Sequence, residues 1–416
     1  MNFYLNKYGF QNPTIKPFPN KKLGICIVIP CYNETELILS LEALYSCDRP
    51  KVPVEIITVI NAGITTNETI KAENRKTYKK AVEWSKNKNT PNFQFHFILE
   101  EALPKKHAGV GLARKIGMDE AVHRFELVKT DGIIVCFDAD SLCETNYLKE
   151  IENHFLQYPK THGCSIHFEH PISGNKFSAA IYTGIINYEL HLRYYNQALK
   201  FAKLPYAFHT VGSSMAVRSS AYQKQGGMNK RKAGEDFYFI HKIIALGNFT
   251  EIKTTKVIPS PRISDRVPFG TGKAIGDWIE KGEEVYKTYA FECFILLKAF
   301  VERISDFSTI DLHSIAFDIN KNQKKQLIDF LETQKFASAI AEISKNSKGE
   351  KAFEKRFFRW FDAFKVLKFI HYLRDNGTRN LPIKEETNKL ISNLFQAKTF
   401  ESEVEQLSFL REIEKK

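Results

Sequence analysis

The sequence of 416 residues contains no long uninterrupted apolar run. A membrane-spanning helix needs ~18 or more such residues. The longest candidate, residues 289–301, is broken by Glu292 and Lys298, which predicts a buried or amphipathic helix. The N-terminal residues also lack the apolar stretch of a secretory signal peptide. We therefore expect a cytoplasmic protein without membrane helices.

The seven cysteines include no C-x-x-C pair. Cys26 and Cys136 fall in predicted strands, where cysteine acts as a small hydrophobic residue. We interpret the cysteines as reduced thiols, which suits the expected compartment. The histidines and cysteine of residues 162–170 do not have the spacing of a standard zinc site.

The net charge is +12, because 60 Lys and Arg outnumber 48 Asp and Glu. This excess favours anionic partners, such as nucleotide phosphates or an anionic membrane surface. No segment resembles a nucleic-acid-binding module, so we expect no nucleic-acid partner. The hydrophobic content of 43% is ordinary for a soluble globular protein, and the length predicts two structural units.

Predicted strands and helices alternate in the first part of the chain. The strands are expected at residues 23–29, 54–60, 93–99 and 132–137, and the helices at 34–45, from about 66, and at 109–125. Such alternation, with nearly continuous apolar strands, indicates an α/β fold with a mostly parallel sheet covered by helices on both faces. We expect an irregular lead-in at 1–21, this α/β domain at 22–280 and a helical domain at 281–416.

Two carboxylates, Asp138 and Asp140, follow the fourth predicted strand. Like charges this close raise each other's pKa unless a cation lies between them. A divalent metal with oxygen ligands suits the pair, and such metals commonly also hold substrate phosphates. A solvated turn or a helix cap would use the same residues.

Polar residues also follow the first two strands, at 30–34 and 61–63. Ligands of parallel sheets bind at the carboxyl ends of the strands, so these segments and Asp138 should converge. Asn33 is expected to cap the next helix with Glu34 near its positive end, and a well-capped β–α turn is the alternative interpretation. Further along, Gly109 and Gly111 open a predicted helix, whose free amides would suit an anion.

Taken in order, six segments resemble the family 2 inverting glycosyltransferases of GT-A fold. They are Val28-Ile-Pro-Cys-Tyr-Asn-Glu34, Gly111-Leu-Ala-Arg114, Phe137-Asp-Ala-Asp140, Gly212-Ser-Ser-Met-Ala-Val-Arg218, Gly226-Gly227 and Gly234-Glu-Asp236. The resemblance covers roughly residues 22–260. It implies a GT-A domain, and we add a helical C-terminal domain to it.

The resemblance also implies roles for individual residues. The metal, Mn²⁺ or Mg²⁺, would be held by Asp138 and Asp140, with Asp138 also on the ribose. Asp236 would be the catalytic base, and Glu235 would orient it or bind acceptor hydroxyls. The remaining donor-binding residues would be Pro30, Tyr32, Asn33, Glu34, Asn61 and Arg114.

Two departures from the family pattern limit what can be carried over. The second strand ends at Asn61 rather than in the acidic residues that hold the nucleobase, which leaves the donor open. The Gln-x-x-Arg-Trp motif of processive synthases is absent, so we expect transfer of a single sugar. In its place, Arg262 and Arg266 lie in a Gly-containing loop that could close over the diphosphate; a plain surface turn is equally compatible.

A stripe of aromatic residues at 353–364 has helical spacing. Such a stripe is usually core, although the neighbouring Lys and Arg residues keep docking on an anionic membrane surface open. The sequence thus predicts a metal-dependent glycosyltransferase with a nucleotide-sugar donor and a glycan, lipid or protein acceptor, as in polysaccharide assembly. The alternatives are a nucleotidyltransferase of the same fold class and a catalytically degenerate sugar- or partner-binding protein.

Overall fold

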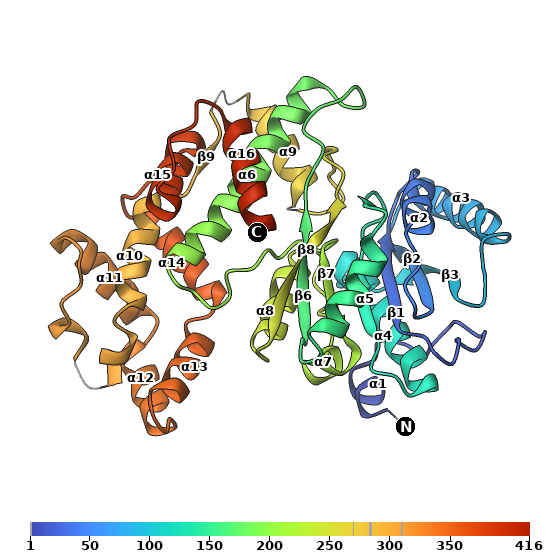
Figure 1. Cartoon of the computed structure of the whole chain (residues 1–416), viewed down its shortest axis with the longest axis horizontal. Helices are drawn as coiled ribbons and strands as arrows, with labels where there is room; N and C mark the ends of the chain where they lie inside the picture. The colour runs from blue at the N-terminus through green and yellow to red at the C-terminus, as the bar shows by residue number, and fades with distance from the viewer. Residues whose placement is uncertain (1, 269, 283–284, 309–310) are drawn as a thin grey trace. The chain divides into compact units, whose positions relative to one another are not determined.

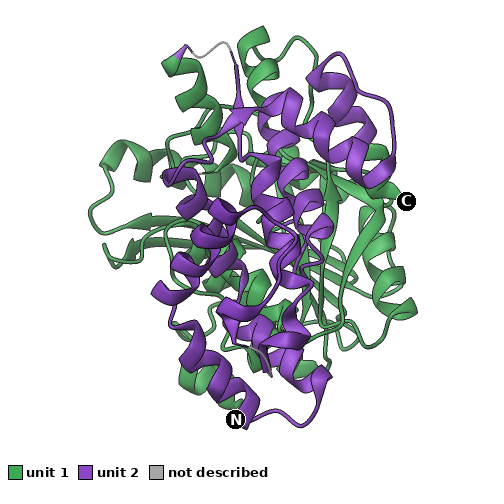
Figure 2. Ribbon diagram, turned by 90° about the vertical axis from the view of Figure 1, so that its left-hand side faces the viewer, with its two compact units in different colours: residues 1–185, 210–281, 411–416 green, residues 186–209, 282–410 purple. Residues whose placement is uncertain are grey.

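A computed structural model describes residues 2–268, 270–282, 285–308 and 311–416. The chain forms two compact units, coloured separately in Figure 2. The first comprises residues 1–185, 210–281 and 411–416, and the second comprises 186–209 and 282–410. The chain passes to the second unit after Lys281, next to the expected boundary at 280. In addition, α6 (Ala179–Phe201) begins in the first unit and ends in the second.

One eight-stranded sheet forms the core of the first unit, in the order β3-β2-β1-β4-β7-β6-β8-β5. Figure 1 labels β1, β2, β3, β6, β7 and β8 of this sheet. Strands β1 to β4 are mutually parallel where they pair, and β6 is parallel to β8. The bounds are β1 Ile25–Cys31, β2 Val54–Gly63, β3 Phe93–Leu103, β4 Ile133–Cys136, β5 Leu142–Cys143, β6 Gly163–Phe168, β7 Met215–Arg218 and β8 Phe249–Ile258.

The mostly parallel sheet predicted from the sequence is confirmed. Every residue of β1 and β2 is buried, as expected for strands covered on both faces. The sheet is not wholly parallel, because β7 runs antiparallel to both β4 and β6, and β5 runs antiparallel to β8. The chain reaches β7 after the long excursion through α6 into the second unit, not through a short βαβ crossover.

The helices of the first unit differ from expectation mainly at the N-terminus. Residues 3–8, expected to be irregular, form a helix that Asn2 caps through a hydrogen bond from the backbone N–H of Leu5. Tyr4 of this helix donates to buried Asp119 of α4 at 2.7 Å. The bounds are α1 Phe3–Tyr8, α2 Leu37–Tyr45, α3 Glu68–Ser85, α4 Val110–Val128, α5 Tyr147–Gln157, α7 Ser219–Lys224, α8 Glu235–Ile244 and α9 Thr271–Lys281.

The end of the chain belongs to the first unit. The last helix, α16 (Glu403–Lys415), carries Arg411, which donates to the backbone oxygen of His170 at 2.8 Å. Its Lys415 lies 2.8 Å from Glu169, just after β6. These contacts join residues that are more than half of the chain apart.

The second unit is helical, as predicted. Phe300, Phe307, Phe357 and Phe361 pack together in its core, so most of the aromatic stripe at 353–364 is core, whereas Phe364 is exposed. The bounds are α10 Phe291–Val301, α11 Lys321–Thr333, α12 Phe336–Lys345, α13 Glu350–Trp360, α14 Ala363–Asp375 and α15 Ile383–Phe395, with short strands β9 Lys287–Thr288 and β10 Leu381–Pro382.

No helix in the described part of the chain is both long enough and apolar enough to cross a membrane.

The fully buried Arg124 of α4 generates a stability prediction. Its guanidinium forms two hydrogen bonds with buried Glu55, one of them at 2.7 Å. Arg124→Met should destabilise the protein by roughly 3–5 kcal/mol, because Glu55 would stay buried without its main partner. Arg75→Met is the matched control, since Arg75 pairs with Glu68 and Glu101 at the surface and its loss should destabilise the protein much less. Urea unfolding of both variants measures the difference, and equal losses would contradict it.

Candidate active site

The segment after β1 does not cap α2 as expected. The helix begins only at Leu37, and Asn33 takes a left-handed conformation with φ of 48°. Glu34 is fully buried, and its carboxylate accepts a hydrogen bond from the backbone N–H of Glu36 at 2.8 Å. The structure therefore assigns the left-handed turn, and not an Asn33 cap, as the link between β1 and α2.

Helix α3 holds this turn through side chains that the sequence analysis did not identify. Buried Asn74 accepts from the backbone N–H of Asn33 and donates to the backbone oxygen of Asn61, both at 2.9 Å. Thr77 donates to the backbone oxygen of Glu34 at 2.8 Å. One helix face thus fixes the ends of β1 and β2 to each other. The sequence signal that could have identified them is the spacing of Asn74 and Thr77, three residues apart on one face of a Lys-rich helix.

Arg114 connects the Asp-x-Asp segment to the Glu-Asp pair. It lies in the first turns of α4, is only 3% exposed, and its Nη2 is 2.5 Å from Asp138 Oδ1. The other guanidinium nitrogen pairs with Glu235 at the start of α8. Gly212 provides the space, since a Cβ there would lie 2.3 Å from the guanidinium. Three predicted site residues therefore meet, with Arg114 bound to carboxylates of the protein itself.

Glu235 and Asp236 occupy the first turn of α8, after Gly234 in a left-handed conformation. Burial raises the pKa of Glu235, although the positive charge of Arg114 acts to lower it. Burial also raises the pKa of half-buried Asp236, and Arg114 again acts to lower it. Asp236 accepts a hydrogen bond from the backbone N–H of Phe237 at 2.8 Å. The pair thus starts helix α8 and also contributes to the carboxylate cluster.

The two loop arginines lie at the ends of β1 and β4. Arg262 pairs with Glu34 and lies 2.7 Å from Asp140, while Arg266 lies 3.0 Å from Glu34. Burial tends to raise the pKa of Glu34, but hydrogen bonds from Glu36 and Arg262 outweigh it and lower that pKa. The loop is thus attached to two predicted donor or metal residues. Phe269, in the same loop, lies outside the described residues.

The glycines singled out as phosphate-binding elements have packing roles here. A Cβ on Gly111 would lie 2.3 Å from the backbone oxygen of Arg231. A Cβ on Gly272 would lie 2.7 Å from the Cβ of Ser264, within the arginine loop. Gly111 therefore allows α4 to approach the segment before α8, and Gly272 allows α9 to pack on the loop.

Asp138 and Asp140 fit a divalent cation that also binds phosphates. Arg114 takes one oxygen of Asp138, and Arg262 takes one oxygen of Asp140. Burial, with Asp138 and Glu34 nearby, raises the pKa of Asp140 even though Arg262 opposes this shift. Among the described residues no three His, Cys, Asp or Glu side chains form a metal-binding group. This donor set suits Mg²⁺ or Mn²⁺, which commonly bind one or two carboxylates plus substrate phosphates.

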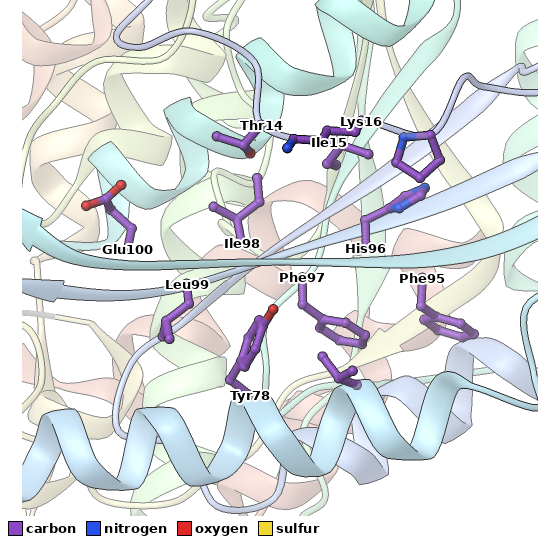
Figure 3. A pocket seen from close by; sticks show the side chains of 12 residues that line it. Thr14, Ile15, Lys16, Tyr78, Phe95, His96, Phe97, Ile98, Leu99 and Glu100 are labelled. Atoms are coloured by element: carbon purple, nitrogen blue, oxygen red, sulfur yellow. The ribbon is translucent and has the colours of Figure 1, made fainter.

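The remaining predicted donor residues lie at the same sheet edge. Pro30 is the penultimate residue of β1, Tyr32 follows that strand, and buried Asn61 lies near the end of β2. A separate pocket follows the outer edge of β3, between the lead-in residues 14–17 and Tyr78 of α3 (Figure 3). None of the predicted site residues lines this pocket.

Residues 133–282 match the family model described as "Glycosyl transferase family group 2". A comparison with curated proteins found no match. Similar solved structures include S. aureus TarS 1–349 in complex with UDP-GlcNAc, at 13% identity and a TM-score of 0.40 over 94% of this chain and 91% of that one. S. aureus TarS is also similar, at 13% identity and a TM-score of 0.35 over 85% of this chain and 53% of that one.

The matched region contains Asp138, Asp140 and the Glu235–Asp236 pair, together with β4 to β8. This segment is thus similar to family 2 glycosyltransferases, and the chain has the predicted architecture of a mostly parallel sheet followed by a helical region.

Because Arg114 is buried, replacing it should cause a loss of stability that depends on pH. Arg114→Met would remove the cation that opposes burial, so the pKa of Glu235 in the folded state should rise further above its unfolded value. The charged carboxylate then costs stability at high pH, and protonation relieves the cost as the pH falls. We expect a loss of roughly 3 kcal/mol at about pH 8 that shrinks toward about pH 5. Denaturant unfolding across this range tests it, and a constant loss would refute it.

Proposed function

We propose that this protein is a metal-dependent inverting glycosyltransferase that moves one sugar from a nucleotide-diphosphate donor to an acceptor hydroxyl. The observation that carries the proposal is the bridge made by buried Arg114 between Asp138 and Glu235. This bridge brings Asp138, a proposed metal ligand, close to the pair Glu235 and Asp236, which contains the proposed base. The family match of residues 133–282 supports the same reaction class.

Asp138 and Asp140 would hold Mn²⁺ or Mg²⁺ through the oxygens that the arginines leave free. The cation would neutralise the charge that develops on the departing nucleoside diphosphate. Asp138 would also accept a hydrogen bond from the ribose. Tyr32, Asn33 and Asn61, held in part by Asn74, would complete the nucleotide site at the ends of β1 and β2.

Asp236 would take the proton of the acceptor hydroxyl as that oxygen attacks the anomeric carbon opposite the leaving diphosphate. The attack forms the new C–O bond, breaks the bond to the diphosphate oxygen and inverts the anomeric configuration. The raised pKa of Asp236 suits a general base, since proton transfer works best near the operating pH. Glu235, held by Arg114, would orient the segment or bind acceptor hydroxyls.

Arg262 and Arg266 would exchange their carboxylate partners for diphosphate oxygens when the donor binds. Both pair with Glu34, and Arg262 also pairs with Asp140, so each already lies beside a predicted donor residue. A guanidinium fork matches phosphate oxygens well. This exchange would place the loop over the diphosphate.

The acceptor would be a glycan, a lipid-linked glycan or a protein, as in surface-polysaccharide assembly. The net charge of +12 supports a cytoplasmic location with peripheral contact to an anionic membrane. Release of free nucleoside diphosphate from a panel of nucleotide sugars, with and without Mn²⁺, tests the activity. Metal-stimulated release from one donor is expected. Release of pyrophosphate from nucleoside triphosphates would instead indicate a nucleotidyltransferase.

Asp140→Asn should abolish Mn²⁺-dependent binding of nucleoside diphosphate and leave the thermal midpoint of the ligand-free protein about unchanged. The amide keeps the shape of the side chain but removes the negative charge that the metal requires. Asp265→Asn is the matched control, because Asp265 is an exposed aspartate of the arginine loop and is not a predicted metal ligand. Calorimetric titration measures both variants, and undiminished metal-dependent binding to Asp140→Asn would remove Asp140 from the metal site.

Asp236→Asn should lower turnover by about 10²–10⁴-fold, the usual contribution of a positioned base, with donor affinity nearly unchanged. Because the pKa of Asp236 is raised, wild-type turnover should fall with decreasing pH at a pH above the ordinary aspartate range. That acidic limb should be missing in the residual activity of the variant. Steady-state kinetics across pH measures both effects. Collapse of donor affinity with turnover preserved would make Asp236 a donor ligand and Glu235 the better base.

A further inference from the structure

Two cysteines far apart in the sequence meet beside the Asp-x-Asp segment. Cys47 follows α2, Cys143 ends β5, and their sulfur atoms are 3.6 Å apart. The adjacent backbones are also joined, since the N–H of Asp48 donates to the oxygen of Thr145 at 2.7 Å. Both thiols are free, and Cys143 is partly exposed next to exposed Leu142. Cys47 is buried, as are Cys26, Cys31, Cys136, Cys164 and Cys293.

We propose that Cys47 and Cys143 are a peroxide-sensitive dithiol that forms a reversible disulfide. The sulfur atoms need to approach by about 1.5 Å to reach the bonding distance of ~2.05 Å. Side-chain rotation can supply such a shift while the hydrogen bond between Asp48 and Thr145 is kept. In a reducing compartment a bond of this kind is transient and redox-sensing, not structural.

The reaction balances with hydrogen peroxide as the oxidant. The Cys47 thiolate attacks one peroxide oxygen, the O–O bond breaks, and a sulfenic acid and one water form after protonation. The Cys143 sulfur then attacks the Cys47 sulfur, the S–O bond breaks, and a second water leaves. In total the two thiols lose two electrons and two protons, and the peroxide is reduced to two waters.

The contact between the two thiols favours Cys47 as the nucleophile that reacts with peroxide. A hydrogen bond from Cys143 lowers the pKa of the Cys47 thiol, although burial acts in the opposite direction. The same hydrogen bond, together with burial, raises the pKa of Cys143. Cys47 therefore has the greater thiolate fraction, which favours its oxidation. Cys143 is the resolving thiol at contact distance.

The disulfide would join the end of α2 to the β5–β8 strand pair, which is flanked by the predicted site residues Asp140 and Arg262. Cys143 pairs with Val257 of β8, and Arg262 lies in the loop that follows this strand. Asp140 precedes β5 by one residue, Ser141. Oxidation would thus restrain the strand pair between Asp140 and Arg262, independently of which nucleotide or sugar the site accepts.

Treatment of the full chain with hydrogen peroxide, followed by non-reducing digestion and mass spectrometry, tests the proposal. The peptides that contain Cys47 and Cys143 should appear as one linked species that dithiothreitol separates. The thermal midpoint should rise on oxidation, because a closed loop constrains the unfolded chain, and should return on reduction. Cys47→Ser and Cys143→Ser should each lose the linked species and the shift, whereas Cys293→Ser should keep both.

If a variant fails to fold, the peptide analysis of the wild-type protein is sufficient to test the proposed disulfide. Sulfinic acid at Cys47 without a linked peptide would overturn the proposal. A bond involving another cysteine, or intact thiols after peroxide treatment that oxidises a free model thiol, would also overturn it.

Discussion

The candidate site depends on the burial of the Arg114 charge. An arginine at 3% exposure is unfavourable in a protein interior unless carboxylates surround it. Asp138 supplies one from the end of β4, and Glu235 supplies another from the start of α8. The end of β4, the start of α8 and helix α4 are thereby held at one point. The same contact makes Gly212 necessary, since any side chain there would occupy the space of the guanidinium.

A second group of charges repeats this arrangement at the surface end of the site. Glu34 is fully buried and faces two arginines from a distant part of the chain. Its negative charge is kept by these cations and by the N–H of Glu36, which together lower its pKa. Glu34, Asp138, Asp140 and Glu235 thus each have an arginine partner from another element. A diphosphate entering this site would compete with carboxylates of the protein for the same guanidinium groups.

The sequence predicted the parts of the fold that follow from local pattern. Continuous apolar runs located β1 to β4, and the parallel arrangement explains why Glu34, Asp138 and Asp140 lie at one edge. The reversed strand β7 was missed because four residues of mixed character give no sign of direction. The helical start at residues 3–8 was also missed, since its anchor is Asp119, more than a hundred residues away.

Within the site, residue types were easier to predict than their partners. Arg114, Glu34 and both loop arginines were predicted to bind the donor. Sequence pattern cannot show that Arg114 pairs with Asp138 and Glu235, or that Glu34 pairs with the two loop arginines. Asn74 was missed because its role depends on two backbone groups, of Asn33 and Asn61, that only the fold brings together. The glycines at 111 and 272 also allow close packing, which the sequence pattern did not indicate.

The contacts of Arg411 and Lys415 with residues after β6 affect how the protein is made. On the ribosome, residues 1–185 and 210–281 emerge well before residues 411–416, which belong to the same unit. Glu169 must therefore remain without its Lys415 partner while the whole second unit is synthesised. Contacts of such long sequence separation form late and slow folding. The C-terminal end of α16 thus completes the sheet unit only after the second unit has been synthesised.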